Sequence, residues 1–148
     1  MVANVAISTE LLAQIVAHAQ QSPFAEVCGL LFGTPDVIDA LERCTNVAAE
    51  PARRFEIDPA QLLAAHRRSR AGGPVVIGHY HSHPSGRAWP SATDAADAVA
   101  DGSVWLIVAG FDVTAWRAVA NGAVEGRFDP LALRMGASVA RNADVEER

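Results

Sequence analysis

The sequence predicts an α/β fold in which a mixed, curved β-sheet is flanked by helices. Segments with the residue spacing of strands alternate along the chain with segments of helical spacing, an order that places helices against a sheet. Half of the 148 residues are hydrophobic, which is enough for one domain with a sizeable core. No apolar run approaches the roughly 20 residues of a membrane span, so we expect no membrane partner.

The first third of the chain predicts strands around one amphipathic helix. Apolar residues recur at helical spacing after Ser8, which is a suitable N-cap. The flanking segments are rich in residues that favour strands, and glycine and proline mark the turn. In order, we expect a strand at Val2–Ile7, a helix from Ser8 to near Ser22–Pro23, a strand at Glu26–Phe32, a turn at 33–36 and an extended segment at 37–47.

The middle of the chain predicts a second helix followed by a buried strand. Asp58 is a suitable cap for this helix, and Gly72–Gly73 ends it. The strand that follows is apolar and is broken by a loop containing Pro84, Gly86 and Pro90. We expect a short strand at Phe55–Ile57, the helix from Asp58 to Gly72, the buried strand at Pro74–Gly78 and a short Ala-rich helix at Ala92–Ala100.

The last part of the chain predicts a β-hairpin and then a tail. Val104–Ala109 and Thr114–Ala120 have the composition of strands. Asn121–Gly122 is typical of a two-residue hairpin turn, which would return the chain into a strand at 123–128. Hydrophobic periodicity is lost after Phe128. We therefore expect one domain over residues 1–128 and a partly disordered C-terminal tail over 129–148.

The stretch from His81 to Asp94 carries the metal chemistry that the sequence predicts. His81 and His83 follow the buried strand, and side chains two residues apart on a strand leave from the same face. Asp94 would lie in the first turn of the short helix, facing back toward the histidines. Two imidazoles, one carboxylate and an open position for water are the arrangement of a catalytic zinc site.

Each part of this stretch also has an explanation without a metal. A His-x-His pair on a strand is often a matter of packing, and Ser91 with Asp94 is typical of a capped helix N-terminus. An acidic residue there is also favoured by the helix dipole. The metal hypothesis accounts for both elements, and for the Gly/Pro-rich loop that joins them, together.

At these residues the chain resembles the JAMM (MPN+) metalloproteases, in particular the short prokaryotic members with a JAB domain. The pattern His81-x-His83-x7-Ser91-x2-Asp94 matches the family signature in full. Residues 23–33 resemble the strand that carries the catalytic glutamate of bacterial members, and the resemblance extends from the first helix to about Phe128. It implies a cytidine-deaminase-like architecture with a zinc ion held by His81, His83 and Asp94.

The resemblance also implies the roles of two further residues. Glu26 would be the carboxylate that takes a proton from the metal-activated water and delivers it to the leaving amine. Ser91 would donate a hydrogen bond to the oxyanion, although a capping role calls for the same residue type. By itself, an acid such as Glu26 after a turn is usually a surface residue.

The implied activity is a metallopeptidase or isopeptidase that hydrolyses an amide bond. Short bacterial members of the family resemble enzymes that trim the C-terminal tail of ubiquitin-like sulfur-carrier proteins, and we expect such a protein or a related peptide as the substrate. The alternative is a non-catalytic MPN-type protein-interaction module. Zinc deaminases are excluded because the chain lacks both H-x-E and P-C-x-x-C. A net charge of −5 argues against a nucleic-acid partner.

The remaining chemistry-bearing residues have less distinct expectations. We expect His79 to pack near the metal ligands without binding the ion, and His18 to lie on a solvated helix face. Trp89 either lines a substrate groove or anchors its loop. The cysteines, Cys28 and Cys44, form no disulfide framework and are expected to be buried thiols, which favours a reducing cytoplasm.

Overall fold

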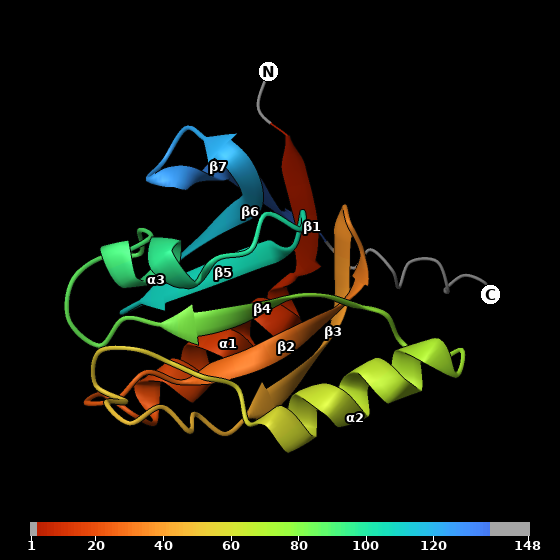
Figure 1. Ribbon diagram of the computed structural model, residues 1–148, viewed down its shortest axis with the longest axis horizontal. Coiled ribbons are helices and arrows are strands. Elements are labelled where there is room, and N and C mark those ends of the chain that lie inside the picture. Colours follow the sequence, from red (N-terminus) through yellow and green to blue (C-terminus); the bar gives the residue numbers. More distant parts are fainter. Residues whose placement is uncertain (1–2, 137–148) are drawn as a thin grey trace.

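The computed structural model describes residues 3–136, which form seven strands and three helices (Figure 1). The predicted α/β class is confirmed. The elements are β1 (Asn4–Ser8), α1 (Thr9–Gln20), β2 (Cys28–Thr34), β3 (Val37–Cys44), α2 (Pro59–Arg70), β4 (Val76–Ser82), α3 (Ala92–Asp97), β5 (Val104–Ala109), β6 (Asp112–Gly122) and β7 (Gly126–Gly136).

The strands form one mixed sheet that closes into a barrel in the order β1-β3-β2-β4-β5-β6-β7. β4 and β5 are parallel, whereas β2 is antiparallel to both of its neighbours. β1 closes the barrel because it pairs in parallel with β7 along five residue pairs and with β3 at Ala6 and Val37. β4, the strand that leads to the histidines, therefore lies between two other strands.

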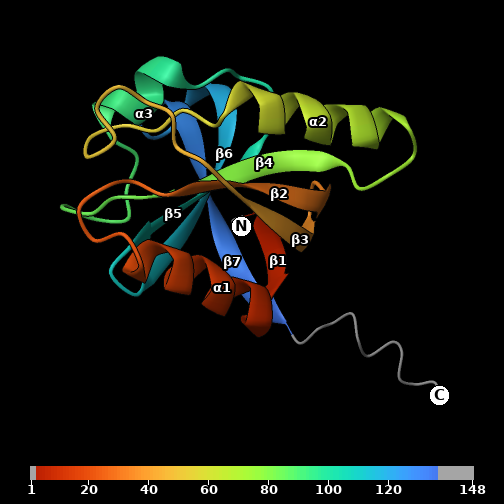
Figure 2. The same ribbon diagram turned by 90° about the horizontal axis from the view of Figure 1, so that it is seen from below.

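The helices cover opposite faces of the sheet around β4 (Figure 2). Alternate residues of one strand point to opposite faces, so neighbouring residues of β2 enter different clusters. Leu31 packs in the cluster that includes Ile15 of α1, whereas Leu30 packs with Ala65 of α2. A third cluster, around Trp105 and Phe128, lies beneath α3.

Each helix begins at the side chain that the sequence predicts as its cap. The Ser8 hydroxyl accepts from the N–H of Leu11 at 3.1 Å, and Asp58 Oδ1 accepts from the N–H of Ala60 at 2.9 Å. These bonds satisfy N–H groups that have no partner within the helix. Local signals thus set the starts of α1 and α2.

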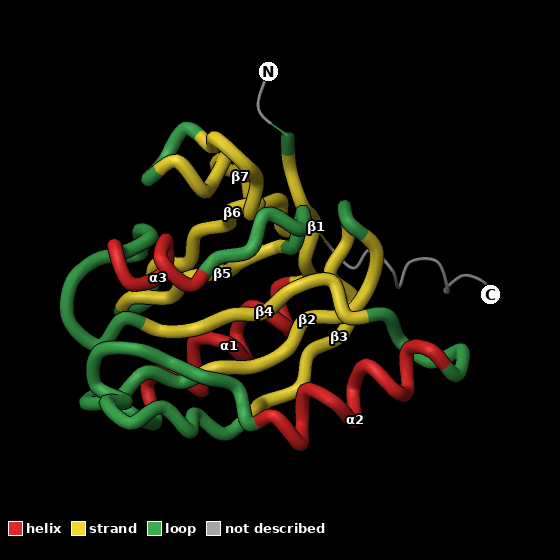
Figure 3. Tube along the Cα trace, in the orientation of Figure 1, coloured by secondary structure: helices red, strands yellow, loops and turns green. Residues whose placement is uncertain are grey.

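Three loops gather at the end of the sheet where β4 ends (Figure 3). They are the segment before β2, the segment between β3 and α2, and the segment between β4 and α3. The second of these was expected to contain a strand at Phe55–Ile57, but it forms only a single bridge between Asn46 and Ile57. The loops bring residues that are distant in the sequence to one place.

The C-terminal part differs most from the sequence-based expectation. β6 continues to Gly122, and Asn121, with φ 56°, lies at its end, so that the hairpin turn spans residues 123–125 instead of Asn121–Gly122. β7 then runs to Gly136, so residues 129–136 belong to the barrel and not to a tail. The expected boundary at 128 falls inside this strand, and residues 137–148 lie outside the described part of the chain.

Within residues 3–136, none of the helices has both the length and the apolar character needed to cross a membrane.

Candidate metal centre

His81 and His83 lie at the end of β4 and point to the same side. His81 is fully buried and stands opposite Cys28 of the neighbouring strand β2. His83 follows the last residue of β4, and its N–H donates to the carbonyl oxygen of Val108 on β5 at 2.8 Å. The extended backbone therefore continues through His83, and the two Nε2 atoms lie 3.2 Å apart.

Asp94 reaches the two histidines from the first turn of α3. Its Oδ1 lies 3.0 Å from His81 Nε2, and its Oδ2 lies 3.1 Å from His83 Nε2. Ligands bound at about 2.0–2.1 Å with tetrahedral angles are separated by about 3.3 Å. The two Nε2 atoms are close to this separation, and one ligand atom from each of the three side chains lies within 4.8 Å of the others, which suits one tetrahedral ion with a position left open. Within residues 3–136, this is the group of side chains that gathers closely enough to hold a metal.

The protonation of the three side chains suits a metal ligand set. Burial alone would raise the pKa of Asp94, but hydrogen bonds from both histidines hold it well below its ordinary value. Burial lowers the pKa of His81 and keeps its ring neutral. Burial also acts to lower the pKa of His83, but the hydrogen bonds to Asp94 and to the Arg87 carbonyl, together with the nearby acidic charges, outweigh it and raise that pKa. A metal ion therefore competes with a proton at His83.

Neighbouring groups fix the orientation of both rings. His83 Nδ1 lies 2.8 Å from the carbonyl oxygen of Arg87. A carbonyl only accepts, so Nδ1 carries a proton, and in the neutral ring Nε2 offers its lone pair toward the ion site. The ring of His81 stacks on Phe55 with centroids 4.3 Å apart, and its Nδ1 has no partner among the described residues.

Glu26 is buried beside the metal ligands, two residues before β2 begins. The N–H of Val27 donates to Ser82 Oγ at 2.8 Å, and the N–H of Ser82 donates to the Val27 carbonyl at 3.1 Å. This pair of bonds holds Glu26 next to the end of β4. Its Oε1 is buried without a hydrogen-bond partner, and burial raises the pKa of Glu26 to about 7. The expectation for an isolated acid, a surface position, is thus wrong here.

Asn46 supports Glu26 and was not identified from the sequence. Its Nδ2 donates to the carbonyl oxygens of Glu26 at 2.9 Å and Arg54 at 3.1 Å. Its Oδ1 accepts from the N–H groups of Ala48 and Glu56, both at 3.0 Å. All four bonds are to backbone groups, so one side chain organises the loop between β3 and α2. A single Asn after an extended segment carries no spacing signal that would reveal this role.

Ser91 is the N-cap of α3. Its Oγ accepts from the N–H of Asp94 at 3.0 Å, and Asp94 Oδ2 accepts from the N–H of Ser91 at 2.9 Å, which completes a capping box. The cap uses only the acceptor capacity of the hydroxyl, and its proton stays available to a substrate oxygen. Capping and oxyanion stabilisation are therefore compatible roles for this residue.

The structure also places His79, His18 and Trp89. His79 packs with its ring centroid 4.3 Å from that of Trp105 and lies outside the ligand group. His18 lies on α1 as expected but is only partly exposed, and its Nδ1 lies 2.6 Å from the hydroxyl of Tyr80. Trp89 is 41% exposed and lines a groove, and its edge-on contact with Trp116 anchors its loop; a role in lining a substrate groove stays a prediction.

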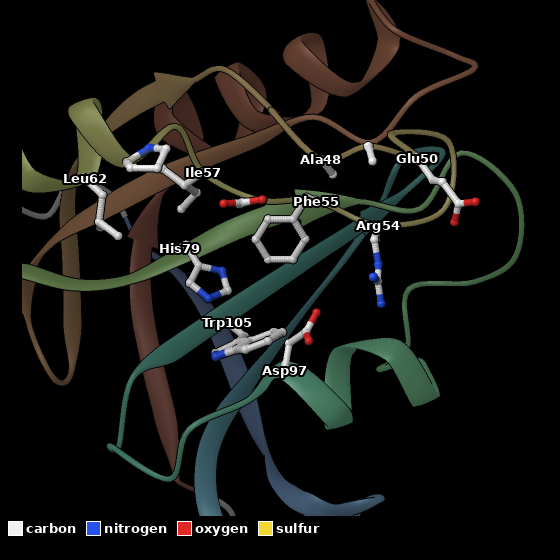
Figure 4. A pocket seen from close by; sticks show the side chains of 12 residues that line it. Ala48, Glu50, Arg54, Phe55, Ile57, Leu62, His79, Asp97 and Trp105 are labelled. Atoms are coloured by element: carbon white, nitrogen blue, oxygen red, sulfur yellow. The ribbon is translucent and has the colours of Figure 1, made fainter.

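Two grooves lie near the metal centre, and of these the first is lined by a metal ligand, His83, whereas the second is not. The first, here called the loop groove, has a volume of about 400 Å³ and lies between the gathered loops. Its lining includes Glu26, Arg53, His83, Arg87, Trp89 and Ser91. The second, here called the sheet groove, has a volume of about 750 Å³ and lies over β4 and β5 (Figure 4). Its lining includes Arg54, Phe55, Ile57, Leu62, His79 and Trp105. Phe55, which stacks on His81, separates the sheet groove from the ion site.

A family model described as prokaryotic homologs of the JAB domain matches residues 8–119. A desampylase of Haloferax volcanii is 39% identical over 99 residues, which cover 63% of this chain and 71% of the relative. A CysO-cysteine peptidase of Mycobacterium tuberculosis is 34% identical over 91 residues, covering 60% of this chain and 61% of that relative. The chain thus spans less than two thirds of the mycobacterial relative.

Solved structures show the same fold. A protein from Desulfitobacterium hafniense superposes with a TM-score of 0.75 at 25% identity, over 89% of this chain and 92% of that one. A JAB1/MPN domain protein from Archaeoglobus fulgidus superposes with a TM-score of 0.55 at 24% identity, over 88% and 97% of the two chains. At this identity the second likeness concerns the fold alone.

Proposed function

Since the chain belongs to the family of prokaryotic homologs of the JAB domain and is a metallopeptidase of the JAMM type, we propose that it is a zinc enzyme that processes the C-terminal tail of a ubiquitin-like sulfur-carrier protein or a related peptide. The names of three relatives support this substrate class: desampylase, CysO-cysteine peptidase and probable TtuB-protein conjugate cleaving protease. The observation that carries the proposal is the convergence of three ligand atoms beside a buried, unpartnered glutamate.

The zinc ion would be held by His81, His83 and Asp94, whose donor atoms suit it in number and type. When bound, zinc lowers the pKa of water toward about 7 and polarises a carbonyl. Such binding requires a neutral His81, an ionised Asp94 and a His83 that is protonated on Nδ1 alone. Because the pKa of His83 is raised, zinc would displace a proton from its Nε2.

Glu26 would take a proton from water and pass it to the departing nitrogen. A base works best when its pKa lies near the working pH, and burial brings the pKa of Glu26 to about 7. Its unpartnered Oε1 leaves an acceptor free for that proton. A protonated Glu26 is then a donor beside the leaving amine.

Ser91 would stabilise the negative charge that develops on the substrate carbonyl oxygen. Its backbone is fixed by the capping box, so the hydroxyl is held in place before the substrate arrives. A donor that is already oriented needs no reorganisation during the reaction, which is the basis of oxyanion stabilisation.

The acyl part of the substrate would lie in the sheet groove as an extended tail. The side chains of Phe55, Ile57, Leu62 and Trp105 give this groove apolar walls (Figure 4). A cytoplasmic location is part of the proposal and is supported by the two buried cysteines, which are free thiols.

The test is a ubiquitin-like carrier fused through its C-terminal Gly-Gly to a short peptide, with the cut bond identified by mass spectrometry. We expect the zinc-loaded chain to cut after the second glycine. Glu26→Gln should keep about one zinc per chain and lose turnover by about 10²–10⁴-fold, because only proton transfer is removed. Asp94→Asn should lose both the metal and turnover.

Unchanged turnover in Glu26→Gln would refute the assigned base. A purified chain that takes up no zinc, even with the metal in excess, would favour the alternative of a non-catalytic MPN-type interaction module.

A further inference from the structure

We propose that Arg53 and Arg87 form a carboxylate-binding subsite on the leaving-group side of the metal centre. The chain would then preferentially release a C-terminal amino acid or short peptide whose α-carboxylate is free, in contrast to an isopeptide-linked lysine. This inference rests on the proposed function and specifies which bond that function acts on.

The position of Glu26 identifies the loop groove as the leaving-group side. In amide hydrolysis the oxygen of water bonds to the carbonyl carbon, the C–N bond breaks, and a proton goes to the departing nitrogen. Glu26 is the group that would deliver this proton, so the nitrogen must lie beside it. Glu26 lines the loop groove and a smaller hollow beside α1, and it is absent from the lining of the sheet groove. Of these three, the loop groove is the one that is also lined by a metal ligand, His83. The acyl part and the departing part thus occupy different grooves.

Two positive charges line the loop groove from different loops. Arg53 comes from the loop between β3 and α2, and Arg87 comes from the loop between β4 and α3. Within residues 3–136 neither guanidinium has a carboxylate within ion-pair distance, whereas Arg68 pairs with Glu42 at 2.7 Å. The whole chain has a net charge of −5, so these two arginines without an acidic partner form a local concentration of positive charge.

Arg87 is held in place by its surroundings. Its guanidinium carbon lies 5.2 Å from the ring centroid of Trp89, whose ring in turn contacts Trp116 with centroids 4.9 Å apart. The Arg87 carbonyl accepts from the Nδ1–H of His83, which ties this loop directly to a metal ligand. A guanidinium held in this way loses less conformational freedom when it binds an anion.

An α-carboxylate is the anion that fits this position. It is attached to the α-carbon that bears the departing nitrogen, so it must lie close to Glu26 and within the same groove. Guanidinium groups bind carboxylates through paired, charge-assisted hydrogen bonds. An amide at the C-terminus lacks the charge, and a lysine linked through its ε-nitrogen has no carboxylate next to the departing atom.

The experiment compares three substrates with the same acyl part ending in Gly-Gly. The first carries alanine with a free carboxylate, the second carries alanine amide, and the third carries the ε-nitrogen of a lysine with blocked ends. We expect the zinc-loaded full chain to cut the free acid roughly 10–100-fold faster than the other two in kcat/KM. In the double variant Arg53→Gln/Arg87→Gln this preference should fall toward one. Arg70→Gln on α2, an exposed arginine outside both grooves, is the matched control and should keep the preference.

A binding measurement separates this inference from the proposed function. In the Glu26→Gln background, which does not turn over, the acid peptide should bind roughly 10-fold more tightly than the amide by calorimetry, and the two arginine substitutions should abolish that difference. Equal binding of acid and amide overturns the subsite, even if all three substrates are cut. A retained preference for the acid in binding, with no substrate cut by the wild-type chain, supports the subsite and overturns the proposed function.

Discussion

At the scale of single residues, the burial of Glu26 has a cost that can be measured. Burial raises its pKa from 4.5 to about 7. Between these values the folded chain holds a proton that the unfolded chain has released, so the free energy of unfolding falls as pH rises through this window. The loss is complete above pH 7 and absent below pH 4.5.

Glu26→Gln removes this pH dependence. In metal-free protein we expect the variant to exceed the wild type in unfolding free energy by up to about 3 kcal/mol at pH 8, and to match it near pH 4. Thermal unfolding of both proteins at the two pH values, in the presence of a chelator, measures the difference. A difference that is the same at both pH values would contradict a buried glutamate with a raised pKa.

Sequence reasoning at this scale succeeds where one residue type has one chemical use. The spacing of His81, His83 and Asp94 is typical of metal binding and of few other structural or functional roles, and the structure brings their ligand atoms together. The role of Asn46 could not be predicted from the sequence, because its four hydrogen bonds are to the backbone of its own loop and of Glu26. Those partners are defined only once the loop has folded.

At the scale of elements, the start of α3 joins helix capping to the metal centre. Ser91→Ala should lower the unfolding free energy by about 1 kcal/mol, whereas Ser91→Gly should lower it by only a few tenths, because glycine is a tolerable N-cap. Both variants keep the backbone N–H that binds Asp94, and both lose the hydroxyl donor. We therefore expect both to lose kcat by about 10²–10³-fold. Thermal unfolding and steady-state kinetics measured on the same samples separate the two effects. A Gly variant with full activity would restrict Ser91 to capping.

β4 shows how an element is determined by more than its own pattern. The sequence places a strand at Pro74–Gly78, but the strand begins at Val76 and continues to Ser82. A Cβ at Gly78 would overlap the carbonyl oxygen of Val104, so glycine is what lets β4 and β5 lie this close. Pairing with β2 and β5 extends the strand through His81 to Ser82. Local residue propensity does not predict this pairing.

At the scale of the whole molecule, β7 is what closes the barrel. Residues 132–136 form all five pairs between β1 and β7, and β1 otherwise pairs only at Ala6 with β3 among the described residues. Leu131 is buried in the same core cluster as Val5 and Ile15. A chain that ends at Phe128 would therefore leave β1 nearly unpaired.

Two truncations test this closure. A chain that ends at Gly136 should unfold cooperatively within a few degrees of the full-length protein, because the barrel is retained. A chain that ends at Phe128 should lose cooperative unfolding, because about 1.5–3 kcal/mol of burial at Leu131 and the pairing of β1 are both removed. Circular dichroism during heating measures both. A stable chain ending at Phe128 would show that β7 beyond this residue is dispensable.

The α/β class, the starts of the helices and the three candidate metal ligands could be predicted from the sequence. Periodicity, capping residues and the spacing of His81, His83 and Asp94 are local signals that lie within short segments. Three other features emerge only when the chain folds: Glu26 is buried beside those ligands, Arg53 and Arg87 share one groove, and the strand after Phe128 closes the barrel. Each of these depends on contacts between segments far apart in the chain, such as Val27 with Ser82, and no local pattern encodes which distant segments will meet.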